Sequence, residues 1–155
     1  MRFLFYDKVA ELEKGRFIVG SKAFALSEGF HERHFSKVPC VPGVILIVAM
    51  AQLLGWLISY SYDFKVFGIM SVLEGVEVAA KLRPGVQAQI RAEIIATTQK
   101  DTLGKAWVEA AGGRVAAVER IIYRHFVEEA PSRLARQFSY YSGMKEFPPD
   151  PVSHQ

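Results

Sequence analysis

A histidine and a glycine at the start of an apolar segment have the clearest capacity for chemistry. His34 lies shortly before Pro39 and Pro42, which fix the direction of the chain. Gly43 then opens the apolar segment. If that segment is a helix, its first backbone amides have no intrahelical acceptor and lie at the positive end of the helix dipole. A carbonyl oxygen could gain negative charge there, and glycine has no side chain to block its approach. A base beside such a site predicts enolate chemistry.

This segment resembles the hallmark of the 3-hydroxyacyl-[acyl carrier protein] dehydratase family, His-Phe-Pro-Gly-x-Pro-x-x-Pro-Gly-Val-x-x-x-Glu-Ala-x-Ala-Gln. The residues in register with that hallmark are His34, Phe35, Pro39, Pro42, Gly43, Val44, Ala49, Ala51 and Gln52. A weaker resemblance extends over residues 21–126, and it includes a Pro-Gly turn at residues 83–85. The last 25 or so residues are not covered by it.

The resemblance implies a hotdog fold and a lyase of fatty acid biosynthesis that needs no cofactor and no metal. In that family the histidine of one subunit removes the α-proton of a 3-hydroxyacyl thioester, and a helix carboxylate of the other subunit protonates the departing hydroxyl. Carried over to this chain, His34 is the base and the amide of Gly43 polarises the thioester. The substrate-binding positions are then Phe35, Pro42, Val44, Val48 and Gln52.

The sequence departs from the family at the carboxylate position, where it has Val48. Loss of a positioned acid typically removes about 100- to 10,000-fold in rate. Three replacements remain open: Glu28 or Glu32 in the preceding loop, a water held by Gln52, or the carboxylate of a different hotdog subunit across a heterodimer interface. Two other functions also remain open, a non-catalytic acyl-thioester-binding hotdog protein and a thioesterase.

The partners that the resemblance implies are acyl carrier protein or a coenzyme A thioester, and a second subunit in a homodimer, a heterodimer or a higher oligomer of dimers. A net charge of +3 suits an acidic carrier or a phosphate. The basic residues expected near the mouth of the site are Arg33, Lys37, Lys81 and Arg83. The charge is not concentrated in a basic run, so nucleic acid is not expected as a partner.

Cysteine and histidine usage argues against a structural metal or a disulfide framework. The chain has one cysteine, Cys40, which excludes an intramolecular disulfide and any site with several cysteine ligands. His31, Glu32 and His34 lie in one loop, but with a single distant thiol they lack a recognised zinc spacing. Cys40 itself is expected to be a small apolar filler.

Hydrophobic patterning predicts an α+β domain in which a curved antiparallel sheet covers one long apolar helix. Residues 86–94 alternate apolar and polar side chains, which is typical of a strand with one buried face. A Gly-Gly pair at residues 112 and 113 predicts a hairpin turn. The expected elements are a strand over 17–24, a loop over 27–42, a helix over 44–58, and strands over 67–82 (possibly broken at Gly75), 86–94, 102–111 and 115–126.

The apolar helix also raises the question of a membrane span. Fifteen residues over 44–58 cover about 22 Å, which is shorter than a bilayer core of about 30 Å. We therefore expect the core helix of a soluble, cytoplasmic protein, and the N-terminus lacks the pattern of a secretory signal. Residues 1–130 are predicted to form one hotdog domain. Residues 131–155 are predicted to be an appendage with a short helix from Pro131 to Tyr141 and a proline-rich tail.

Overall fold

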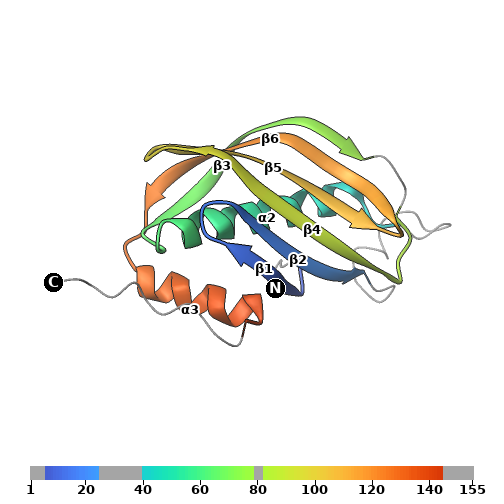
Figure 1. Cartoon of the computed structure of the whole chain (residues 1–155), viewed down its shortest axis with the longest axis horizontal. Coiled ribbons are helices and arrows are strands. Elements are labelled where there is room, and N and C mark those ends of the chain that lie inside the picture. The colour runs from blue at the N-terminus through green and yellow to red at the C-terminus, as the bar shows by residue number, and fades with distance from the viewer. Residues whose placement is uncertain (1–5, 25–39, 79–81, 145–155) are drawn as a thin grey trace.

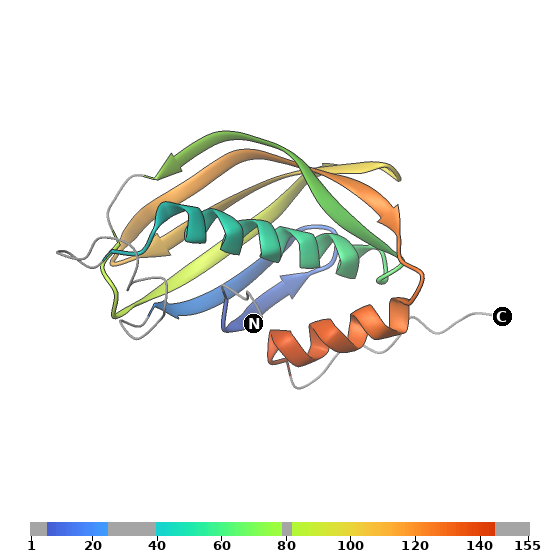
Figure 2. The same cartoon turned by 180° about the vertical axis from the view of Figure 1, so that it is seen from behind.

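A curved antiparallel sheet wraps around one long helix in the computed structural model, which describes residues 6–24, 40–78 and 82–144 (Figures 1 and 2). The strands of the sheet lie in the order β1-β2-β4-β5-β6-β3. Their bounds are Lys8–Glu13 (β1), Phe17–Phe24 (β2), Val66–Val78 (β3), Val86–Thr97 (β4), Asp101–Ala110 (β5) and Gly113–Val127 (β6). The helices are α2, Gly43–Ser61, and α3, Pro131–Ser142. The α+β architecture predicted from the sequence is confirmed.

Alternation along the strands places apolar side chains against α2. In β4, Ala88, Ile90 and Ala92 are buried, whereas Gln87 and Gln89 are exposed on the other face of the sheet. The turn between β5 and β6 is made by residues 111 and 112, both with positive φ, as a tight hairpin turn requires. The strand predicted over 86–94 and the hairpin between β5 and β6 are therefore confirmed, but the turn lies one residue earlier than the predicted Gly-Gly pair, because Gly113 already pairs with Ala110.

Two glycines let α2 lie very close to the sheet. A Cβ added to Gly20 of β2 would lie 2.7 Å from Cδ1 of Leu53, and one added to Gly104 of β5 would lie 2.6 Å from Cδ2 of Leu54. Leu53 and Leu54 are themselves fully buried. The absence of side chains at these two strand positions therefore makes room for the leucine side chains of α2.

The helix α2 has the length and hydropathy of a membrane span, but it packs as a core helix. An 18-residue window of the helix has a mean hydropathy of 2.0, and 44% of that window is buried inside the protein. The core helix of a soluble protein passes the same test of length and composition. Leucine and methionine side chains at Leu46, Met50 and Leu57 are completely buried against the sheet. The rest of the helix surface is left partly uncovered by this chain.

The sheet differs from the sequence prediction at both edges. β1 was not predicted, because its residues are mostly polar and only Val9 becomes buried; it is held by antiparallel pairing with β2. β3 is not broken at Gly75, which has a φ of 65° and remains within the strand. The irregularity of β3 lies instead between Met70 and Val72, where its register with β6 shifts.

The C-terminal helix α3 lies beside β1, near the C-terminal half of α2 (Figures 1 and 2). Pro131 stands in its first turn, and Gly143 follows it in the left-handed conformation, so both ends carry the expected signals. Phe138 anchors α3 by packing its fully buried ring against Trp56 of α2. The predicted short helix is confirmed.

Candidate functional site

The structure describes some of the site residues predicted from the sequence, and the others lie outside the described residues. The predicted base His34 and the neighbouring Phe35 lie outside the described residues. So do Glu28, Glu32, Arg33, Lys37 and Lys81. The described members are Pro42, Gly43, Val44, Val48 and Gln52, and the structure places all of them at the start of α2 or along its first half.

Two backbone amides at the N-terminus of α2 have no acceptor within the described part of the chain. The amide of Val41, before the helix, donates to the carbonyl of Leu82 at 2.8 Å, and the amide of Ile45 donates to the carbonyl of Pro42 at 3.0 Å. Between them, the amides of Gly43 and Val44 have no acceptor among the described residues. Pro42 provides no side-chain cap, and the first turn has no acidic residue. Partial positive charge therefore accumulates at this end of the helix.

Close packing against β3 fixes the position of this helix end. A Cβ added to Gly43 would lie 3.0 Å from Cγ2 of Val78, the last residue of β3. The hydrogen bond from Val41 to Leu82 ties the preceding residue to the segment that leads into β4. The chain around the start of α2 is thus held by the end of β3 at Gly43 and by the segment before β4 at Val41.

The face of α2 that carries Val44 and Val48 is turned away from the sheet. Val44 is 58% exposed, and Val48 and Gln52 are half-buried. Leu46 and Leu53, which lie on the opposite side of the helix, are fully buried. The position where the dehydratase hallmark has a carboxylate is occupied by the apolar side chain of Val48, so this face offers no proton donor there.

A buried tyrosine that the sequence analysis missed lies between β6 and α2. The hydroxyl of Tyr123 on β6 donates to the carbonyl of Ala51, and its ring lies beside Gly55. Burial raises the pKa of Tyr123 above its ordinary range, so the side chain stays neutral. The contact of Tyr123 with α2 is apparent only in the tertiary structure.

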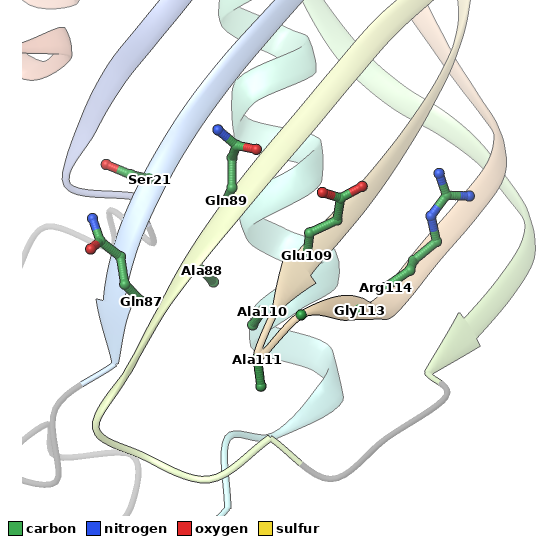
Figure 3. Close-up of a pocket in the computed structure, with 10 residues that line it drawn as sticks. Ser21, Gln87, Ala88, Gln89, Glu109, Ala110, Ala111, Gly113 and Arg114 are labelled. Carbon is green, nitrogen blue, oxygen red and sulfur yellow. The ribbon is translucent and has the colours of Figure 1, made fainter.

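Three hollows of the described surface lie on the outer face of the sheet, away from α2. One has a volume of about 610 Å³ and is lined by Gln89, Glu109 and Arg114 near the turn between β5 and β6 (Figure 3). Arg114 also lies over the ring of Trp107, with its guanidinium carbon 4.6 Å from the ring centroid. These polar side chains shield the outer face of the sheet, whereas α2 packs on its inner face, so the hollow is separate from the predicted site.

The described residues contain no group of three or more histidine, cysteine or acidic side chains that could hold a metal ion. Cys40 is a free and buried thiol just before α2. Of the four basic residues expected near the mouth of the site, Arg83 is described, and its side chain is exposed at the turn into β4.

Comparison with known proteins adds evidence from the sequence. The model of the FabA-like domain matches residues 1–124. The 3-hydroxyacyl-[acyl-carrier-protein] dehydratase FabZ of Ruminiclostridium cellulolyticum is 35% identical over 117 residues, covering 74% of this chain and 81% of the relative. The protein of the same name from Clostridioides difficile is 32% identical over 112 residues, covering 72% of this chain and 78% of the relative.

Solved structures share the fold at low sequence identity. The dehydratase heterocomplex ApeI:P from Xenorhabdus doucetiae is 12% identical, with a TM-score of 0.65 over 84% of this chain and 88% of that one. The protein smu.793 from Streptococcus mutans, solved with acetyl CoA, is 13% identical with a TM-score of 0.57, covering 78% and 87%. Thioesterase HI1161 from Haemophilus influenzae is 8% identical with a TM-score of 0.62, covering 77% of each chain.

Proposed function

Because the chain belongs to the family of FabA-like domains, we propose that it dehydrates 3-hydroxyacyl thioesters to enoyl thioesters in fatty acid biosynthesis. Its curved sheet around α2 is the hotdog fold that the sequence resemblance implied. The observation that carries the proposal is that the described hallmark residues Pro42, Gly43 and Val44 lie at the start of α2, where the amides of Gly43 and Val44 have no acceptor among the described residues.

In the proposed reaction, the imidazole of His34 takes a proton from the carbon next to the thioester carbonyl. The negative charge that develops on the carbonyl oxygen is stabilised by the amide of Gly43 and by the positive end of α2. The hydroxyl on the next carbon leaves with a proton from an acid, which gives water and a carbon–carbon double bond. No redox change or cofactor is needed for this step.

Acyl carrier protein or coenzyme A would carry the substrate, and the reaction would take place in the cytoplasm. Phe35, Pro42, Val44, Val48 and Gln52 would line the site around the thioester. Arg83, with Arg33, Lys37 and Lys81, would attract the acidic carrier or its phosphate. This docking surface is supported by the positive charge of its four residues and by the exposure of Arg83, the one that the structure describes.

A second subunit is proposed to cover the edge strand β3 and the free face of α2. β3 ends the sheet, so within the described part of the chain one side of its backbone has no neighbouring strand. Four apolar side chains along it, at Ile69, Met70, Val76 and Val78, are 42 to 52% exposed. An exposed apolar edge of this kind is an association surface, and the proposed site at Gly43 lies directly beside it.

We assign the missing acid to that second subunit. Val48 provides no proton, and Glu77, the acidic neighbour of Val78, lines a hollow with Arg114 and Ala117 on the outer face of the sheet. A homodimer would have valine at both carboxylate positions, whereas a different hotdog subunit would provide the carboxylate across the interface. The structure that shares the fold with a TM-score of 0.65 is described as a dehydratase heterocomplex.

Thioester assays with His34→Ala test the proposal. The purified chain, alone and with a carboxylate-bearing hotdog subunit from the same source, would be incubated with 3-hydroxybutanoyl and crotonyl thioesters. We expect interconversion with the second subunit present and a loss of about 100- to 10,000-fold in H34A. His31→Ala, in the same loop, is the matched control and should keep its rate.

Other outcomes would contradict the proposal in specific ways. Release of free thiol without interconversion would indicate a thioesterase. Saturable binding of the thioesters with neither reaction, whichever hotdog subunit is added, would indicate a non-catalytic acyl-thioester-binding protein. Equal loss of rate in H31A and H34A would show that the loop matters only for folding.

A further inference from the structure

The part of the chain that contains the predicted base is attached at both of its ends to one short turn. At its start, the carbonyl of Phe24, the last residue of β2, accepts a hydrogen bond from the amide of Gly85 at 2.6 Å. At its end, the amide of Val41 donates to the carbonyl of Leu82 at 2.8 Å. The two partners are three positions apart, just before β4 begins. We call residues 82–85 the anchor turn.

The hydrogen bonds to the anchor turn start from buried backbone. Phe24, Val41 and Leu82 are buried, whereas Gly85 is exposed. The pairing of β2 with β4 extends to Phe24 and Val86, so the bond to Gly85 adds one more link to this ladder. A hydrogen bond between buried groups is strong, because water does not compete for either partner. Both ends of the segment are therefore fixed to the sheet.

Gly85 gives the anchor turn its shape. Its φ is 91°, in the region that glycine adopts without steric cost. Pro84 precedes it, and proline followed by a residue with positive φ is the pattern of a type II turn. A Cβ added to Gly85 would have no heavy atom of the described residues within 4 Å. A side chain there would therefore strain the backbone of the turn without colliding with a neighbour.

The anchor turn also lies next to the amide proposed to bind the thioester oxygen. Val41 stands two residues before Gly43, and the proline between them has a fixed φ. The end of β2, the start of β4 and the start of α2 lie at the same end of the molecule (Figures 1 and 2). One turn thus holds both ends of the segment with His34 and the residue that leads into the helix.

We propose that the anchor turn positions His34 relative to the amide of Gly43, and that Gly85 is a positioning residue of the dehydration. The inference rests on the proposed function, because it needs His34 as the base and Gly43 as the oxyanion donor. Both groups must reach the same thioester, so a displacement of about 1 Å slows the reaction strongly. A distorted anchor turn should therefore slow the chemical step more than it weakens substrate binding.

Gly85→Ala is the first test. The full chain, with its second subunit, would be assayed with 3-hydroxybutanoyl N-acetylcysteamine, which has no carrier, so the proposed docking charges do not enter. We expect kcat to fall at least about tenfold, with KM within about twofold of the wild type. Gly85→Asn should regain about half of the wild-type kcat or more, because asparagine accepts a positive φ in this turn. A normal kcat in folded G85A, or a G85N as slow as G85A, would overturn the proposal.

Gly15→Ala is the matched control. Gly15 has a φ of 77° and likewise no heavy atom of the described residues within 4 Å of an added Cβ. Its amide donates to Oγ of Ser61 at 2.8 Å, at the opposite end of α2 from Gly43. The same backbone strain is thus placed far from the proposed site, and kcat should stay within about twofold of the wild type. An equal fall in G15A and G85A would overturn the proposal.

A second variant covers the case in which G85A does not fold. Pro84→Ala loosens the turn and leaves the glycine with its positive φ, so it adds no strain. We expect kcat to fall about threefold, again with little change in KM. An unchanged kcat in P84A would then overturn the proposal.

A double mutant separates positioning from a general loss of structure. If Gly85 acts through His34, G85A should lower the residual rate of H34A by less than about twofold, because the group that it positions is gone. If the turn mattered only for folding, G85A would slow H34A by the same factor as it slows the wild type. That result would overturn the positioning role.

Amide hydrogen exchange, measured by NMR, tests the anchor turn without turnover. The Val41 amide should exchange at least about tenfold faster in G85A, because its bond to Leu82 is weakened, and at the wild-type rate in G15A. Faster exchange in G85A, in a protein that shows no dehydration, would overturn the proposed function and keep the anchor turn. Wild-type dehydration with kcat and exchange unchanged in G85A would overturn the anchor turn alone. No dehydration and no change in exchange would overturn both.

Discussion

Gly43, the first residue of α2, lies against Val78, the last residue of β3, so closely that an added Cβ would be 3.0 Å from Cγ2 of Val78. The contact joins the helix end, whose first amides have no acceptor among the residues that the structure describes, to the edge strand with exposed apolar side chains. The proposed oxyanion site and the proposed subunit interface are therefore parts of the same small region.

Gly43→Ala should lower activity without a large change in stability. The new Cβ requires the Val78 side chain to move by a few tenths of an ångström, which it can do because it is partly exposed. The free energy of unfolding should therefore change by less than about 1 kcal/mol. The dehydration rate should fall at least about tenfold, because the methyl group occupies the approach to the amide. Gly113→Ala, with open space around it, is the control. A normal rate in folded G43A would argue against the oxyanion role.

Val48→Glu should restore a proton donor to the chain itself. We expect dehydration by the homogeneous protein to rise by about 100-fold or more, within the range that a positioned acid contributes. Val44→Glu places a carboxylate one turn earlier on the same face and should give no gain. Steady-state rates with 3-hydroxybutanoyl thioester measure both variants. No gain in a folded V48E would indicate that the site serves another purpose.

Val76→Lys should disrupt the proposed interface along β3. Val76 is 42% exposed on the edge strand, and a lysine there would bring a charge into an apolar contact. We expect the mass measured by sedimentation to shift from dimer to monomer, with the circular dichroism spectrum kept. Ile95→Lys, on β4 and 51% exposed, should leave the mass unchanged. A dimer that survives V76K would place the interface elsewhere.

Gly104→Ala should destabilise the fold strongly. Its Cβ would lie 2.6 Å from Cδ2 of Leu54 and 2.8 Å from the carbonyl oxygen of Glu93, which is backbone and has little freedom to move. We expect a loss of about 1 to 3 kcal/mol in the free energy of unfolding by urea, as for other overpacked cores. Gly113→Ala should stay within about 0.5 kcal/mol of the wild type.

Alkaline pH should destabilise the protein through Tyr123. Burial raises its pKa in the folded state, so above about pH 10 the unfolded chain loses this proton while the folded chain keeps it. The free energy of unfolding should therefore fall, by up to about 1.4 kcal/mol per pH unit for this group. Tyr123→Phe should cost about 1 kcal/mol at neutral pH through its lost hydrogen bond to Ala51, and should flatten the alkaline fall. Urea unfolding as a function of pH measures both effects. An equally steep fall in Y123F would assign it to other groups, such as Tyr6.

The sequence was most informative where the evidence is local. The alternation over residues 86–94 and the Gly-Gly pair are properties of neighbouring residues; the first agrees with β4, and the second predicted the hairpin with its turn one residue too late. The spacing of prolines and glycine before the apolar run placed the start of the helix, which begins at Gly43. The roles of His34 and Gly43 stay predictions that the experiments above address.

The tertiary structure decided what depends on contacts between distant residues. The polar segment Lys8–Glu13 becomes a strand because β2 offers it a partner, and no pattern within the segment reports that. The meeting of Phe138 with Trp56, and of Gly43 with Val78, joins residues 82 and 35 positions apart. A sequence records which side chains are apolar, whereas only packing determines which of them touch, because burial is a property of the whole folded chain.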